Sequence, residues 1–303
     1  MQFSMWPSAE RTTAELLDRA RQADADGWFG VWIMDHYMPN TGTEEVASGD
    51  IHECWALLAA IAAVTERVRI GSLVSPTSVH HPAVLAKRAT TVDHMSNGRL
   101  VLGIGAGWQI NEHQAYGIEL EPPGVRVSRF EEAIQVIRAL LADDLVDFHG
   151  DFYDITGAPA DPKPVQAPLP ILVGTASPRM LGITVAHADE WNTWGAPELA
   201  IGNRQKMLAA CERAGRDPAS MHTSTQALVF LTDDTELAER VLNAPMGPRT
   251  IAGNAEQLAA ELRRYADAGF DEFIVLDNPL GASPAARAEA YARLQAEVFS
   301  LLD

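Results

Sequence analysis

Residues 68–108 read VRIGSLVSPTSVHHPAVLAKRATTVDHMSNGRLVLGIGAGW, and this stretch decides the fold class. Two short apolar runs within it, Val68–Val74 and Leu100–Ile104, have the length and composition of strands. The segment between them, Pro82–Met95, begins with proline and has the length of a helix. A strand, a helix and a second strand in this order form a βα unit of a parallel sheet.

The same alternation runs through the whole chain. The predicted strands are Gln2–Trp6, Gly30–Met34, Val68–Val74, Leu100–Ile104, Ile171–Gly174, Glu190–Thr193, Thr223–Leu231 and Glu272–Leu276. The predicted helices are Thr13–Ala25, Cys54–Thr65, Pro82–Met95, Val127–Leu141, Pro178–His187, Pro197–Ala214, Ala255–Ala268 and Pro284–Leu302. Eight such units can close into a (β/α)8 TIM barrel or form an open doubly wound sheet, and we expect closure. Residues 1–303 would then form a single barrel domain, with insertions at Pro39–Glu53 and Asp143–Leu169.

Composition excludes several classes of partner. The formal net charge of −18 repels nucleic acid backbones and anionic lipid surfaces, so we expect neither as a partner. Cys54 and Cys211 lie far apart, which predicts neither a disulfide framework nor a metal site. We recognise no signal peptide in the first residues, and we expect a cytoplasmic protein.

The reactive groups of such a barrel lie at the carboxyl ends of its strands, and the second strand has the clearest candidates. Asp35 and His36 follow Gly30–Met34 directly. We expect His36 to face the barrel mouth and Asp35 to hold backbone or a cofactor. The alternative is a capping aspartate beside a histidine that only packs.

Three other strand ends carry small or polar residues. The exit of the third strand, Gly71–Thr77, fits either a bulge that faces a ligand or an ordinary polar turn. Glycines 103, 105 and 107 permit close approach of a flat ring, or the packing of a tight barrel corner, and they do not form the dinucleotide fingerprint. Gly174–Pro178 leads at once into a helix, which suits a phosphate group, although Ser177 can equally be a plain N-cap.

Taken in order, these motifs resemble one family. The run from Gly71-Ser72-Leu73-Val74-Ser75-Pro76 through His81–Ala86 and Asp93–Leu100 to Gly103–Trp108 resembles the luciferase-like monooxygenase superfamily and its deazaflavin-dependent oxidoreductases. Further similarity extends through most of the chain. The Gly107–Trp108 pair, with Glu112 nearby, is more similar to the branch that uses coenzyme F420.

The resemblance implies a (β/α)8 fold, often as a homodimer, with F420 or FMN in the mouth. The expected catalytic residues are His36, as the acid or base, and Asp35, which would also contact the cofactor. A non-proline cis peptide bond would join Ser72 to Leu73. The expected cofactor-binding residues are Asp35, Ser72, Leu73, Ser75, Gly105, Gly107, Asn111, Gly174, Thr175, Ala176 and Ser177. The expected substrate-facing residues are Trp6, Trp108 and Thr193.

Two positions depart from the family pattern. Deazaflavin-dependent sugar phosphate dehydrogenases have a catalytic Glu where this chain has Trp108, which argues against a sugar phosphate substrate. Many members have Arg where this chain has His80. We therefore expect hydride transfer between F420 and a small organic substrate, with an FMN-dependent monooxygenase or a non-catalytic flavin-binding protein as alternatives.

Overall fold

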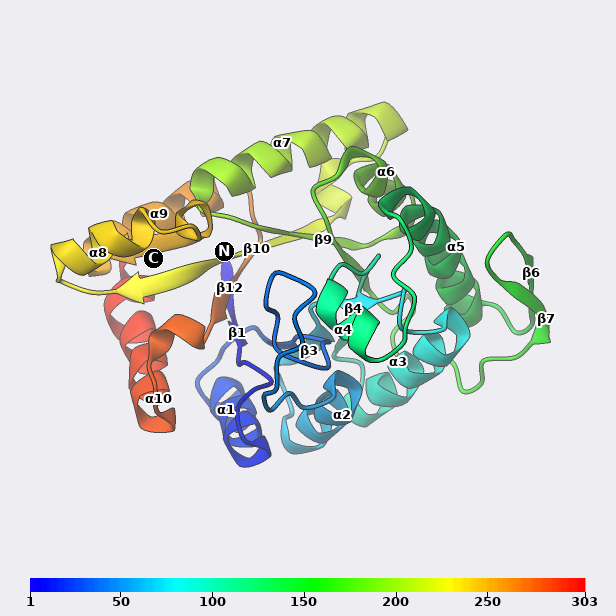
Figure 1. Cartoon of the computed structure of the whole chain (residues 1–303), viewed down its shortest axis with the longest axis horizontal. Helices are drawn as coiled ribbons and strands as arrows, with labels where there is room; N and C mark the ends of the chain where they lie inside the picture. The colour runs from blue at the N-terminus through cyan, green and yellow to red at the C-terminus, as the bar shows by residue number, and fades with distance from the viewer. Residues whose placement is uncertain (303) are drawn as a thin grey trace.

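The computed structural model describes residues 1–302, and its strands form a closed barrel (Figure 1). The strands are β1 (Gln2–Trp6), β2 (Gly30–Ile33), β3 (Arg69–Ser72), β4 (Ser75–Pro76), β5 (Leu100–Gly105), β6 (Val146–His149), β7 (Asp154–Ala158), β8 (Ile171–Gly174), β9 (Glu190–Trp194), β10 (His222–Leu231), β11 (Thr250–Gly253) and β12 (Glu272–Leu276). Parallel pairing runs in the order β12, β1, β2, β3, β5, β8, β9 and β10. Because β10 pairs with both β9 and β12, the ring is complete.

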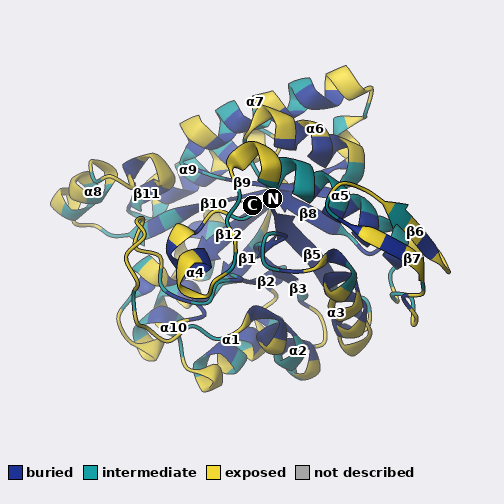
Figure 2. Ribbon diagram, turned by 45° about the vertical axis from the view of Figure 1, so that its right-hand side comes forward, coloured by how far each residue is buried: buried dark blue, intermediate teal, exposed yellow. Residues whose placement is uncertain are grey.

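The helices of residues 1–302 cover the outside of this ring, except for one short helix, Ile110–Ala115, which lies at its mouth. They are α1 (Thr13–Ala25), α2 (Cys54–Val64), α3 (Pro82–Ser96), α4 (Ile110–Ala115), α5 (Pro123–Ala142), α6 (Pro178–His187), α7 (Pro197–Ala214), α8 (Thr235–Leu242), α9 (Ala255–Asp267) and α10 (Pro284–Arg293). Figure 2 shows the strands of the ring almost entirely buried and the exposed residues mostly on helices, loops and the β6–β7 hairpin. None of the helices in residues 1–302 is both long and apolar enough to span a membrane.

The predicted closed barrel is therefore confirmed, and the boundaries of β1, β8, β12, α1, α6 and α7 agree with the sequence-based ranges. The third strand differs, because β3 covers only Arg69–Ser72 of the predicted run Val68–Val74, and the two-residue strand β4 follows beyond the end of that run. The last predicted helix also differs. It changes at Leu294 into a π-helical turn and then a 3-10 turn, where Phe299 stacks on Phe3 with ring centroids 3.7 Å apart.

Some elements were not predicted. Helix α4 is only six residues long, and β6 and β7 form a short hairpin with several exposed residues, so neither has a strong apolar period. Helix α8, which precedes β11 in the chain, was not predicted either. Strand β11 extends the sheet beside the barrel, because it pairs with the last four residues of β10. The long arrow of β10 in Figure 1 shows this extension beyond the ring.

The barrel interior is charged at the amino ends of the strands. Arg69 forms ion pairs with Glu190 and Glu272, and His222 Nε2 lies 3.1 Å from a Glu272 carboxylate oxygen. Burial raises the pKa of Glu190. Burial also opposes ionisation of Glu272, but the bond from His222 and the charge of Arg69 bring its pKa below the usual value. These paired charges close the end of the barrel opposite the mouth.

An apolar layer separates those charges from the mouth. It consists of Trp32, Leu73, Val101, Leu172 and Ile274, and the half-buried side chains of Trp6 and Val74 pack against it. Trp32 also donates its indole N–H to Glu272 over 2.7 Å, which connects the two layers. The mouth therefore has a solid apolar floor.

Candidate active site

Asp35 lies at the centre of a buried hydrogen-bond network at the end of β2. Its Oδ2 atom accepts from the Ser75 hydroxyl at 2.6 Å and from His80 Nε2 at 2.8 Å. The Ser75 hydroxyl in turn accepts from the Trp55 indole N–H at 3.1 Å. The other carboxylate oxygen, Oδ1, is buried and has no partner. A buried carboxylate oxygen without a donor is costly, so this atom is suited to accept from a bound molecule.

His36, the next residue, is held by a different carboxylate. Its Nδ1 lies 2.9 Å from Oε1 of Glu112, and the other oxygen of Glu112 accepts from the backbone N–H of Tyr37 at 2.9 Å. The Glu112 side chain is 2% exposed, whereas that of His36 is 18% exposed. A carboxylate on Nδ1 fixes the ring orientation and leaves Nε2 as the nitrogen that can exchange a proton.

Helix α4 brings Glu112 to this position and also holds the long loop after β2. The side chains of Gln109 and Asn111 donate to the carbonyl oxygens of Met38 and Pro39, each over 2.9 Å. The Tyr116 hydroxyl donates to the Tyr37 carbonyl at 3.2 Å. Asn111, expected as a cofactor contact, thus has its amide engaged by the loop, because the loop carbonyls would otherwise lack a donor.

The non-proline cis peptide bond lies between Leu73 and Val74, so the expected position between Ser72 and Leu73 was wrong by one residue. The reason lies in strand pairing. Ser72 is still in register with Ile33 of β2, and the N–H of Leu73 donates to the Ile33 carbonyl at 2.8 Å. Leu73 then fills the apolar floor, and the chain leaves the strand geometry only after it.

The glycines of β5 and β8 make room for Val74. A Cβ atom added to Gly103, Gly105 or Gly174 would lie 3.3, 2.8 or 3.4 Å from a Val74 methyl group. A Cβ on Gly103 would also lie 1.9 Å from the Ser72 carbonyl oxygen. These contacts are those of a tight barrel corner, and the approach of a flat ring to the same glycines stays a prediction. The Ser72 hydroxyl is likewise occupied, since it donates to the Gly103 carbonyl at 2.8 Å.

Residues 105–108 lead from β5 to the rim of the mouth. Gly107 has a φ of 89°, and a Cβ there would lie 2.0 Å from the Ser78 hydroxyl, so the position requires glycine. Trp108 follows, is 56% exposed, and meets the His36 ring edge-on with centroids 5.5 Å apart. The exposed indole therefore lies directly beside the proposed acid–base residue.

The segment Gly174–Ser177 lies between β8 and the amino end of α6. The Thr175 N–H donates to the Asn192 carbonyl at 3.1 Å, and the Thr175 carbonyl accepts from the Trp191 indole at 2.8 Å. Ala176 is half-buried, and Ser177 is an exposed N-cap whose hydroxyl makes no capping bond. The predicted helix start is thus present beside the mouth, with its hydroxyl not used by the helix.

The predicted substrate-facing residues divide into two groups. Trp6 lies above the apolar floor and 5.9 Å from the ring of Trp194. Thr193 instead has its hydroxyl 3.0 Å from the Asn203 amide of α7, on the outer face of β9. Side chains alternate along a strand, so Asn192 and Trp194 are the inward residues of this strand. The expected placement of Thr193 towards the substrate side was wrong for this reason.

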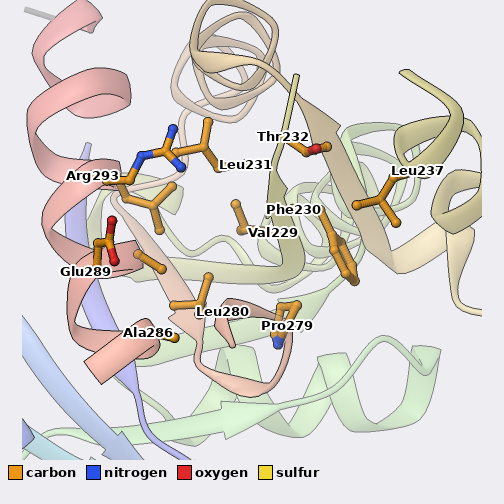
Figure 3. A pocket seen from close by; sticks show the side chains of 12 residues that line it. Val229, Phe230, Leu231, Thr232, Leu237, Pro279, Leu280, Ala286, Glu289 and Arg293 are labelled. Carbon is orange, nitrogen blue, oxygen red and sulfur yellow. The ribbon is translucent and has the colours of Figure 1, made fainter. Parts of the chain in front are cut away.

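A separate hollow of about 330 Å³ lies on the flank between the end of β10, helix α8 and helix α10 (Figure 3). It is lined by apolar side chains such as Leu231 and Leu280 and by the charged residues Glu289 and Arg293. It contains none of the residues described above. Within residues 1–302, no group of three His, Cys, Asp or Glu side chains is arranged to hold a metal ion.

Residues 1–269 match the family model described as luciferase-like monooxygenase. The chain belongs to this family.

Several curated proteins that are similar to this chain in sequence are named as dehydrogenases. An F420-dependent glucose-6-phosphate dehydrogenase from Nakamurella multipartita is 30% identical over 92% of this chain and 84% of its own. Another, from Amycolatopsis mediterranei, is 36% identical over 54% of this chain. The chain spans about half the length of this relative and of two further curated relatives, with 48–49% of each relative's own length covered.

Solved structures of similar fold have low sequence identity. An F420-dependent secondary alcohol dehydrogenase in complex with an F420–acetone adduct has a TM-score of 0.79 at 22% identity, over 91% of this chain and 92% of that one. The coenzyme F420-dependent tetrahydromethanopterin reductase from Methanopyrus kandleri has a TM-score of 0.82 at 16% identity, over 100% and 99%. At such identities the likeness concerns the fold alone.

Sequence reasoning did not assign a role to two residues of the candidate site, Glu112 and Arg88. Glu112 was noted near Trp108 but was not given the task of holding His36. Arg88 is in α3, eight residues after His80, and its Nη1 lies 3.1 Å from His80 Nδ1. A signal for Glu112 exists, since an acidic residue in a short helix after a strand end can turn towards the mouth. The periodic pattern of apolar residues in α3 gives no signal that would distinguish Arg88 from other exposed residues of this helix.

Proposed function

We propose that this protein is an oxidoreductase that uses coenzyme F420 at the barrel mouth and transfers a hydride to or from a small organic substrate. The observation that carries the proposal is the Asp35–His36 pair. One residue has a buried carboxylate oxygen without a donor, and the other has an oriented imidazole with a free Nε2. The F420-dependent relatives support the choice of cofactor.

The residues at the mouth fit a flat ring. Val74 projects from the floor between glycines, and the bare Oδ1 of Asp35 offers an acceptor at one side. Ser75 holds Asp35, and the segment Thr175–Ser177 offers the start of helix α6 for a phosphate group. When bound, F420 supplies the two-electron hydride chemistry.

The protein's own share is proton transfer and orientation. His36 Nε2 gives a proton to the substrate oxygen when a carbonyl is reduced, and takes that proton when an alcohol is oxidised. Glu112 holds the ring through Nδ1 in either direction. Trp108 and Trp6 offer apolar surface to the substrate, and Trp108 replaces the Glu of the sugar phosphate dehydrogenases, so the proposed substrate is planar or apolar.

A parallel titration tests the cofactor. The apoprotein is titrated with F420 and, separately, with FMN, and quenching of cofactor fluorescence is measured. We expect saturable quenching of F420 at lower protein concentration than of FMN. Tight binding of FMN with no response to F420 would instead identify a flavin-dependent member of the family.

The assembly and location of the protein are further proposals. We expect residues 1–303 to act as one domain, in a cytoplasmic homodimer. Light scattering coupled to size-exclusion chromatography would give twice the chain mass of 32.8 kDa if the dimer forms.

A further inference from the structure

The buried network around Asp35 continues outward to a surface arginine. His80 lies between the two charged groups, with Nε2 2.8 Å from Asp35 Oδ2 and Nδ1 3.1 Å from Arg88 Nη1. A guanidinium has only donors. Two donors cannot share a hydrogen bond, so Nδ1 must carry the lone pair and the proton must be on Nε2. The geometry therefore requires a neutral imidazole.

This neutral state has a consequence for Asp35. A histidine beside a carboxylate ordinarily gains from a second proton, since the ion pair is favourable. An imidazolium here would cancel the negative charge of Asp35, and its second N–H would point at the guanidinium. Arg88 opposes that protonation through both the clash of donors and the repulsion of two positive charges.

Arg88 acts from outside the barrel. It lines a groove of about 400 Å³ between α2 and α3, together with Glu53 and Trp55. Glu53 is the N-cap of α2, and its carboxylate accepts from the Ala56 N–H at 2.7 Å. Glu53 is thus engaged by the start of α2 and makes no bond to His80. The charged residues that are hydrogen-bonded to His80 are Asp35 and Arg88.

We propose that Arg88 is a positioning residue that keeps His80 neutral and thereby keeps the full negative charge of Asp35 available at its bare Oδ1. The link to cofactor binding rests on the proposed function, in which Oδ1 faces F420. The state of His80 itself does not, because it is a property of the protein without cofactor.

The test combines three variants and a control. Arg88→Met removes the donors from an exposed side chain, and His80→Gln keeps a donor near Nε2 but cannot take a proton. The third variant is R88M/H80Q. Lys87→Met is the control, since it removes the same charge from the neighbouring position, where Lys87 bonds the Asp161 carbonyl and does not touch His80.

Two readouts are measured at pH 7. Nitrogen-15 NMR of the apoproteins reports the protonation state of each of the nine histidines, and the His80→Gln spectrum identifies the His80 signals. We expect a neutral ring protonated on Nε2 in the wild type and in K87M, and an imidazolium in R88M. Fluorescence titration should give about tenfold weaker F420 binding in R88M, as for a lost charge-assisted interaction.

The double variant separates positioning from simple support of the fold. If Arg88 acts through the proton on His80, R88M/H80Q and H80Q should bind F420 within twofold of each other. A tenfold loss that persists in the H80Q background would overturn the proposal, as would a neutral His80 in R88M. If no variant, including the wild type, binds F420, the proposed function fails, and the NMR result alone decides the role of Arg88.

Discussion

Replacing Glu112 by Gln tests the orientation of His36 most directly. Both partners of the Glu112 carboxylate are donors, the Nδ1–H of His36 and the N–H of Tyr37, each at 2.9 Å. An amide has only one oxygen, so its NH₂ group must face either the Tyr37 N–H or the His36 Nδ1. In the first case a buried donor is left unpaired, and in the second the proton of His36 moves to Nε2.

The magnitude follows from the contact that is lost. A hydrogen bond to a charged group contributes about 1.5–3 kcal/mol. At roughly 1.4 kcal/mol for each factor of ten, E112Q should lower turnover by about 10- to 150-fold. F420 binding should change much less, because Asp35 and Ser75 keep their contacts.

The assay is single-turnover reduction or oxidation of bound F420, followed by its absorbance, alongside a binding titration. Glu119→Gln is the control, since Glu119 is an exposed acidic residue shortly after α4. Turnover of E112Q within twofold of the wild type would show that Glu112 does not orient the reacting imidazole. A loss of F420 binding equal to the loss of turnover would assign Glu112 to the cofactor instead.

Three further predictions concern the barrel mouth, the tight corner at β5 and the charged amino end of the barrel. His36→Ala should reduce turnover by roughly 100-fold or more while F420 still binds, as a turnover assay and a titration will show. Gly103→Ala should destabilise the fold by about 1–3 kcal/mol or more in urea unfolding, because the new Cβ would lie 1.9 Å from a backbone carbonyl oxygen, whereas Gly182→Ala, in α6 with open space around it, should stabilise slightly. Burial lowers the pKa of His222, but the bond to Glu272 and the negative charges of Glu190 and Glu272 together outweigh it and raise that pKa above its usual value. Its stabilising effect is therefore full below the unfolded pKa of about 6.5 and is lost as pH rises through the folded pKa, so the stability of the wild type should fall relative to His222→Gln as the pH is raised above about 6.5, measured by thermal melts; parallel curves would contradict this.

The barrel was predictable because its signal is local and repeated. Each strand is a short apolar run, each helix has its own period, and proline starts several helices, as at Pro82, Pro178 and Pro197. The exit of the third strand shows the limit of such reasoning. Its residues indicated an irregular strand end, but pairing with Ile33 of β2 decided that the change comes after Leu73.

The candidate site was predictable to the extent that it lies at strand ends. Asp35, His36 and Ser75 were found because residues after parallel strands meet at one edge of the barrel. The contacts of Thr193 and Asn111 were not predictable in the same way. The hydroxyl of Thr193 bonds Asn203 of α7, and the amide of Asn111 bonds carbonyls of the loop after β2, and both partners are distant in sequence.

The sequence by itself determined the βα repeat, the acidic surface charge and the presence of an acid and an imidazole at the end of the second strand. Only the tertiary structure decided which atoms of those residues are free. Asp35 Oδ1 is bare because Ser75 and His80 both approach Oδ2, and His36 Nε2 is available because Glu112, 76 residues away, takes Nδ1. Hydrogen bonds between segments distant in sequence have no local period, so they become visible only when the barrel closes.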